Sequence, residues 1–313
     1  MKLVLILLIC IIVLLVLCLV TNKNNENFSN YNSLNKHFTF LSSDEACDLI
    51  KDIDYFQNLN KRDILARKYI ANKNTILENY CSGFLDFTES DKKKIKSVLE
   101  KLENNELFKS WSFAKIDTEI ENGYPHTHKD TIFLSSQTIN DTPKILQYIL
   151  VHEQMHVMQR KKPALFAKLY LEYFPFKSGK LNLESSIVNR MRSNPDTRLV
   201  PDNEFIYVND TDTDEYYYLC ALYTSEVPSG LGDVDYVAIK LTYDNNTDVY
   251  TGTDEIVEII KLNNYNNFFR LTGNHYHPNE ISAELIALHY SNKNEEPSQA
   301  LIKTSMWIKD NIV

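Results

Sequence analysis

The most hydrophobic part of the chain is an uninterrupted apolar run from Leu3 to Val20, preceded by Lys2. As a helix this run is about 27 Å long, close to the thickness of the hydrocarbon core of a bilayer. Its end lacks the small residues that favour signal-peptide cleavage. We therefore expect an uncleaved transmembrane signal-anchor over residues 1–20, followed by a polar linker over 21–36.

Two later stretches have apolar residues at helical spacing. Thr142 and Pro143 suit an N-cap and a first helical position, and the apolar pattern that follows predicts a long buried helix extending toward Tyr173. Pro278 likewise suits the first turn of a second helix, and Ile281 begins the apolar stripe with which this helix would pack against the first.

Aromatic and β-branched runs predict strands both before and after the first of these helices. The expected strands before it are 111–116 and 131–135, with the strand pattern also readable from His126 to Leu134, and those after it are 205–208, 216–222 and 236–243. The pattern predicts an α+β domain over residues 37–313, with a β-rich insertion at about 185–253 that either walls a cleft or is purely structural.

The strongest chemical signal lies inside the first helix, where residues 152–156 read His-Glu-Gln-Met-His. On an α-helix His152 and His156 lie on successive turns and face the same point, where a Zn²⁺ ion would bind. Glu153 flanks that point and is the expected general base, which takes a proton from the attacking water. The pattern is typical of zinc-dependent hydrolases.

A catalytic zinc site needs a third protein ligand, and the second helix offers two carboxylates on one face. Glu280 and Glu284 lie four residues apart, so the spacing leaves both open as ligands. This arrangement resembles the gluzincin branch of the zincin metallopeptidases, in which a glutamate on a helix after HExxH is the third ligand. The resemblance favours Glu280 as the metal ligand, with Glu284 orienting a ligand histidine.

The segment after His152 is also similar to poorly characterised HExxH proteins of large DNA viruses and microbes. The long separation between His156 and Glu280 departs from the compact gluzincin families, and the metzincin extension HExxHxxGxxH is missing after His156. The resemblance implies a zincin-like metallopeptidase fold.

Three further residues are candidates for the cleft. Tyr276 lies just before the second helix and could donate a hydrogen bond to the oxyanion. His126 and His128 alternate along an expected strand, so their side chains share one face. They would either border the cleft near the zinc or lie exposed on an edge strand.

Composition limits the other partners. The formal net charge is -9, without a concentrated basic stretch, which argues against nucleic acid as the main ligand. The 7 glycines form no phosphate-binding loop, so we expect no nucleotide cofactor. Of the 5 cysteines, Cys47, Cys81 and Cys220 lie outside the apolar run, which allows one disulfide and one free thiol.

The sequence thus predicts a membrane-anchored zinc metallopeptidase that hydrolyses peptide bonds in a peptide or protein substrate. Lys2 and the amino terminus put the positive charge on the short side of the membrane helix, so the catalytic domain would face the lumen or the exterior. A viral or host internal membrane is one such compartment. The alternatives are an inactive, membrane-tethered binding or structural module with the same scaffold, and a zinc hydrolase of a non-peptide amide.

Overall fold

Two β-sheets organise the chain from His37 to Val313, which forms one unit. The structure is a computed structural model, and it describes residues 36–51, 54–68, 73–103, 105–197, 204–210, 215–291 and 296–312. The expected membrane helix over 1–20 lies outside these residues, as does nearly all of the expected linker. None of the described helices combines the length and the apolar character needed to cross a bilayer.

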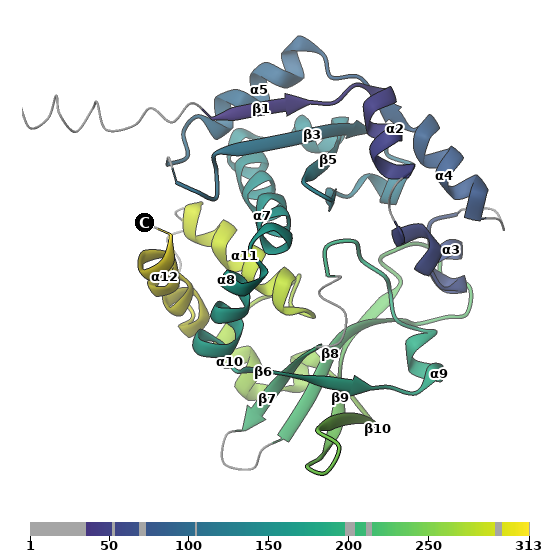
Figure 1. The fold of residues 1–313 in the computed structure, drawn as a ribbon, viewed down its shortest axis with the longest axis vertical. Helices are drawn as coiled ribbons and strands as arrows, with labels where there is room; N and C mark the ends of the chain where they lie inside the picture. Colours follow the sequence, from purple (N-terminus) through teal and green to yellow (C-terminus); the bar gives the residue numbers. More distant parts are fainter. Residues whose placement is uncertain are drawn as a thin grey trace, which may run out of the picture. The chain divides into compact units, whose positions relative to one another are not determined.

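The first sheet is built around three parallel strands, β1 (His37–Phe40), β3 (Ser110–Ile116) and β5 (Thr131–Ser135). The short strand β2 (Phe84–Leu85) pairs antiparallel with the end of β3, and β4 (His126–His128) forms an antiparallel edge next to β5. β3, β4 and β5 are short but largely buried, because helices pack against them (Figure 1), whereas the residues of β1 are at least partly exposed.

The strand expected over 131–135 is confirmed as β5, but the reading of 126–134 as one strand is wrong, because the chain reverses between β4 and β5. β4 and β5 form a hairpin in which His128 pairs with Thr131. Lys129 at the turn has a φ of 52°, which is a left-handed conformation. Glycine and asparagine favour this conformation, so a lysine at this position does not predict the turn. The reversal makes β4 a separate edge strand.

Three helices surround this sheet, α2 (Ser43–Lys51), α4 (Lys73–Ser82) and α5 (Glu89–Leu99). A disulfide between Cys47 and Cys81 joins α2 to α4, and Cys220 is a buried free thiol. Thr88 caps α5 and forms a capping box with Asp91. The short elements between these helices are η1 (Asp54–Asn58), α3 (Lys61–Ala66), η2 (Ile120–Gly123) and α6 (Ser136–Ile139).

The long helix α7 (Pro143–Lys161) begins as the sequence predicts, with the Thr142 side chain accepting a hydrogen bond from the backbone N–H of Ile145. It ends earlier than expected. The chain kinks at Lys162 before α8 (Pro163–Lys168), because a proline cannot continue the hydrogen-bond ladder of α7. A short π-helix, η3 (Leu169–Tyr173), completes the segment.

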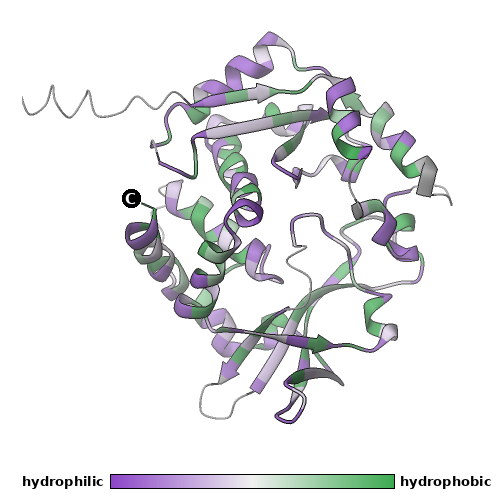
Figure 2. Ribbon diagram, in the orientation of Figure 1, coloured by the Kyte–Doolittle hydropathy of each residue, from purple (hydrophilic) through white to green (hydrophobic). Residues whose placement is uncertain are grey.

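Helix α11 (Pro278–Tyr290) packs along α7, and the final helix α12 (Gln299–Asn311) packs on α11. His277 caps α11, its Nδ1 accepting from the backbone N–H of Asn279. Figure 2 shows hydrophobic residues along both α7 and α11. Because α7 and α11 are buried against each other, side chains on their shared face are held in fixed positions.

The second sheet is a closed five-stranded barrel in the order β10-β6-β7-β8-β9. Its strands are β6 (Phe176–Asn182), β7 (Glu204–Asp210), β8 (Glu215–Tyr223), β9 (Val234–Asp244) and β10 (Val249–Glu258), with α9 (Ser185–Val188), η4 (Ile259–Lys261) and α10 (Asn263–Phe269) beside them. The β-rich segment therefore starts before residue 185 and ends after residue 253. Gly179 allows the close packing of Tyr250 on β6, because a Cβ there would lie 2.4 Å from that ring.

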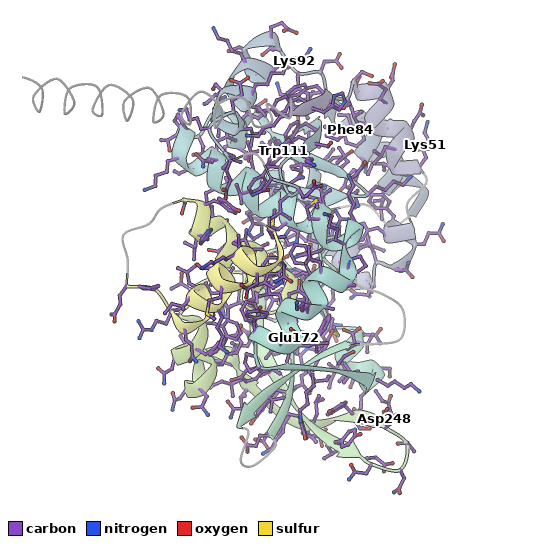
Figure 3. The ribbon with its side chains drawn as sticks, turned by 60° about the vertical axis from the view of Figure 1, so that its left-hand side comes forward. Lys51, Phe84, Lys92, Trp111, Glu172 and Asp248 are labelled. Atoms are coloured by element: carbon purple, nitrogen blue, oxygen red, sulfur yellow. A yellow bond between two sulfur atoms is a disulfide. The ribbon has the colours of Figure 1, made fainter. Side chains whose placement is uncertain are left out.

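Figure 1 shows α7, α8 and α11 between the first sheet and the barrel. A single hydrophobic core includes residues of the first sheet, of these helices and of the barrel. In Figure 3, Trp111 lies inside this unit, whereas Lys51 and Asp248 lie at its periphery. The helices that carry the HExxH residues and the two candidate glutamates are therefore at the centre of the unit.

Candidate metal centre

Three side chains from α7 and α11 converge on one point. The Nε2 atoms of His152 and His156 lie 3.1 Å apart, and Oε2 of Glu280 lies 3.4 Å from the first and 3.7 Å from the second. Around a tetrahedral ion with bonds of about 2.0–2.1 Å, ligand atoms are separated by about 3.3–3.4 Å. The three groups can therefore hold a metal ion.

The charge of this group favours a cation. Burial alone raises the pKa of Glu280, but His156 and the hydrogen bond with His152 outweigh burial and bring this pKa to about 2. Burial lowers the pKa of His152, yet hydrogen bonds with Glu280 and Glu284 outweigh it and raise this pKa well above its ordinary value. The carboxylates thus create a negative potential at the two imidazoles, which a bound cation would satisfy.

The ring of His156 is fixed by Gln159, one turn further along α7. Oε1 of Gln159 lies 2.9 Å from Nδ1 of His156, while Nε2 of Gln159 donates to the Asn279 carbonyl at 2.9 Å and to Ser282 Oγ at 3.0 Å. Because the amide nitrogen faces the carbonyl, its oxygen faces the imidazole, and Nδ1 must carry the proton. Nε2 of His156 then presents a lone pair to the metal group.

Glu284 lies on the other side of His152 from the metal group. Its Oε2 is 3.6 Å from Nδ1 of His152, and its other oxygen accepts a hydrogen bond from the hydroxyl of Tyr148. Glu284 is therefore placed to orient the imidazole of His152, whereas Glu280 faces both Nε2 atoms.

Glu153 is buried beside the same point, and its Oε2 has no hydrogen-bond partner among the residues that the structure describes. Burial raises the pKa of Glu153 well above its ordinary value, and repulsion from Asp196 adds to the effect. Glu153, His156 and Asp196 could also hold an ion. However, Oδ1 of Asp196 already accepts from the backbone N–H of Thr127 at 3.1 Å, so this second group is a poorer fit.

A cavity of about 370 Å³ opens on this centre. Tyr276 lines it, and Nδ2 of Asn194 donates to the Tyr276 hydroxyl at 2.6 Å and to Oε1 of Glu280 at 2.7 Å. Because Asn194 supplies the proton in that hydrogen bond, the hydroxyl proton of Tyr276 is left to donate into the cavity. Leu231 and Tyr236 of the barrel segment form part of the wall.

The two histidines of β4 are both buried, each 4% exposed, so the expectation of exposed histidines on an edge strand is wrong. His126 lines the cavity, and its Nδ1 lies 2.9 Å from the carbonyl oxygen of Tyr124. His128 does not line the cavity and packs against Tyr55 and Phe133 instead. β4 borders the cavity, but only one of its histidines faces it.

Several residues of the centre were not singled out from the sequence. Gln159 and Tyr148 could have been found, because they lie three residues after His156 and four residues before His152 on the same helix. The segment that carries Asn194 and Asp196 reads Asn-Pro-Asp-Thr, a composition typical of a turn, and lies within the expected β-rich insertion. Its position over the centre depends on long-range packing that a local pattern does not encode.

Comparison with protein-family models, curated protein sequences and solved structures finds no match to this chain. The architecture is a mixed α/β unit with two sheets. Any proposal about function therefore depends on the geometry of the candidate metal centre.

Proposed function

We propose that the protein is a zinc-dependent metallopeptidase of the zincin type. The observation that supports this most strongly is the spacing of 3.1, 3.4 and 3.7 Å among the ligand atoms of His152, His156 and Glu280, with the Glu153 carboxyl beside them. Three protein ligands with a cavity on the fourth side are typical of catalytic zinc sites, whereas structural zinc sites use four protein ligands.

Zinc bound here would polarise a water molecule and the scissile carbonyl. Glu153 takes a proton from the attacking water as the new C–O bond forms, and passes it to the leaving amine as the C–N bond breaks. The Tyr276 hydroxyl donates a hydrogen bond to the carbonyl oxygen, where negative charge develops. Glu284 and Gln159 orient the ligand histidines from outside the cavity, and Asn194, which lines the cavity, holds Tyr276 and Glu280 in place.

The test of this proposal is the Glu153→Gln variant of the full-length chain in detergent. Products released from a mixture of peptides would be identified by mass spectrometry. We expect the variant to keep zinc but to cleave at least about 100-fold more slowly, because it lacks the proton acceptor. Glu172→Gln, an exposed change on η3, is the matched control and should cleave as the wild type does. Equal rates for the wild type and Glu153→Gln would contradict the proposal.

We also propose that the run from Leu3 to Val20 anchors the enzyme in a membrane, with the catalytic unit on the lumenal or exterior side. The Cys47–Cys81 disulfide supports that side, because disulfides persist in oxidising compartments. Protease digestion of sealed membrane vesicles tests the orientation. The unit should be protected in vesicles that keep the lumenal face inside, and digestion without detergent would contradict this orientation.

A further inference from the structure

Two arginines line the cavity beside the metal group, and they differ in how their charge is balanced. The guanidinium of Arg67 donates to Glu121 at 2.8 Å and lies 3.3 Å from a carboxylate oxygen of Asp63, so two carboxylates offset it. These three side chains are almost fully buried. Arg67 is therefore part of an internal ion network. Its positive charge is already neutralised by these two carboxylates and is not available to bind a ligand.

Arg192 has no such partner. Across the described ranges of the chain, no carboxylate lies within ion-pair distance of its guanidinium, which donates to the carbonyl oxygen of Leu231 at 3.2 Å. Its Cζ atom lies 5.0 Å from the ring centroid of Tyr276 and 5.8 Å from that of Tyr236. The rings and the carbonyl hold the guanidinium in one orientation, and the nearby carboxylate of Glu280 acts on it electrostatically without forming an ion pair.

Tyr276 connects this cation to the metal group. The guanidinium of Arg192 lies against the Tyr276 side chain, and the Tyr276 hydroxyl is joined through Asn194 to Glu280, in steps of 2.6 and 2.7 Å. An extended peptide advances about 3.3–3.6 Å per residue. A peptide with its cleaved bond at the metal group would therefore reach Arg192 within about three residues.

We infer that Arg192 binds a carboxylate of the substrate, so that the enzyme prefers peptides with an acidic group close to the cleaved bond. This inference rests on the proposed peptidase function. A guanidinium recognises a carboxylate through two parallel hydrogen bonds, which a neutral amide in the same place cannot reproduce. The carboxylate comes either from the C-terminus of the substrate or from an aspartate or glutamate side chain.

The experiment uses the full-length, zinc-loaded protein and peptides of identical sequence made in matched forms. One pair has a free or an amidated C-terminus, and the other pair has glutamate or glutamine near the cleaved bond. We expect the wild type to prefer the carboxylate member of at least one pair about tenfold or more in kcat/KM, mainly through KM, because a hydrogen bond to a charged group is lost in the other member. The pair that shows the preference identifies the source of the carboxylate.

The variants are Arg192→Gln and its matched control, Arg190→Gln. Arg190 lies two residues earlier on the same segment and does not line the cavity. We expect Arg192→Gln to bind zinc and to cleave both members of each pair within about twofold of each other, whereas Arg190→Gln keeps the wild-type preference. A preference that survives in Arg192→Gln would overturn the inference, since the carboxylate would then be bound elsewhere, for instance by the zinc. So would a wild type that cleaves all forms equally.

Failure of the peptidase function itself gives a different result. If the zinc-loaded wild type cleaves none of the peptides, calorimetric titration with the same pairs decides the matter. Binding of the carboxylate form at least about tenfold tighter than the amide form, lost in Arg192→Gln but not in Arg190→Gln, would retain Arg192 as a carboxylate-binding residue. Equal affinities would overturn that role as well.

Discussion

The side chain of Gln159 sets the tautomer of His156, because its Oε1 lies 2.9 Å from Nδ1 of the imidazole. The amide oxygen can only accept, so Nδ1 carries the proton and Nε2 faces Glu280 with a free lone pair. The neutral imidazole is thus oriented for metal coordination by a residue of its own helix.

Replacing Gln159 by leucine should therefore weaken zinc binding. We expect a loss of about 10-fold to 100-fold in affinity, the usual effect of removing a group that orients a ligand histidine. Competition with a coloured chelator measures the affinity. The control is Gln154→Leu, since Gln154 is also buried on α7 but donates to the carbonyl oxygens of Leu107 and Ser110, away from the centre. If both variants keep the wild-type affinity, the orienting role of Gln159 is wrong.

The ion network around Arg67 should matter for stability. Arg67→Met would leave the buried carboxylates of Asp63 and Glu121 without their cation, and we expect the free energy of unfolding to fall by about 3–5 kcal/mol. Urea denaturation at neutral pH measures the change. The exposed pair of Lys92 and Glu89 is the comparison, and Lys92→Met should cost about 1 kcal/mol or less. Similar losses in the two variants would contradict the importance of burial.

Acid should destabilise the fold through His128. Burial holds the pKa of His128 well below its ordinary value, with His126, Arg160 and Arg67 adding to the effect, and no described group hydrogen bonds to its Nε2. The unfolded chain takes up this proton near pH 6.5 and the folded chain only at lower pH. The free energy of unfolding therefore falls as the pH drops below about 6.5.

This effect can be isolated with His128→Phe, which removes the titrating group and keeps a ring in the aromatic surroundings. Between pH 7.5 and 5.5, with zinc chelated, the wild type should lose about 1 kcal/mol more stability than the variant, as measured in urea. The pH 7.5 value of each protein serves as its own reference. Parallel losses in both proteins would show that His128 does not contribute.

How far the sequence alone predicts this protein depends on the range of each interaction. The start of α7 at Thr142 and Pro143 and the start of α11 at Pro278 depend on local capping, and the sequence pattern located both. The pattern also singled out His152, His156 and Glu280, which the structure brings together. The helical repeat of α7 places His152 and His156 on one face. The apolar stripes with which α7 and α11 pack against each other place Glu280 next to them.

The remaining features depend on contacts between distant segments. The reversal at Lys129 contains neither glycine nor asparagine, so the strand pattern also allowed His126 to Leu134 as one strand, and the burial of both β4 histidines was left open. Asn194 reaches Glu280 only because the segment before the barrel crosses the centre. Arg192 reaches Tyr276 in the same way, and nothing in its local sequence distinguishes it from the other arginines.

The central claim is that His152, His156 and Glu280 form one zinc site. Elemental analysis of the full-length chain, purified in detergent and compared with Glu280→Gln and Glu284→Gln, tests it most directly. We predict about one zinc per wild-type chain, loss of the zinc in Glu280→Gln, and retention of most of it in Glu284→Gln at saturating zinc. A folded wild type that holds no zinc after zinc is supplied, or a Glu280→Gln variant that binds it as tightly as the wild type, would contradict the account.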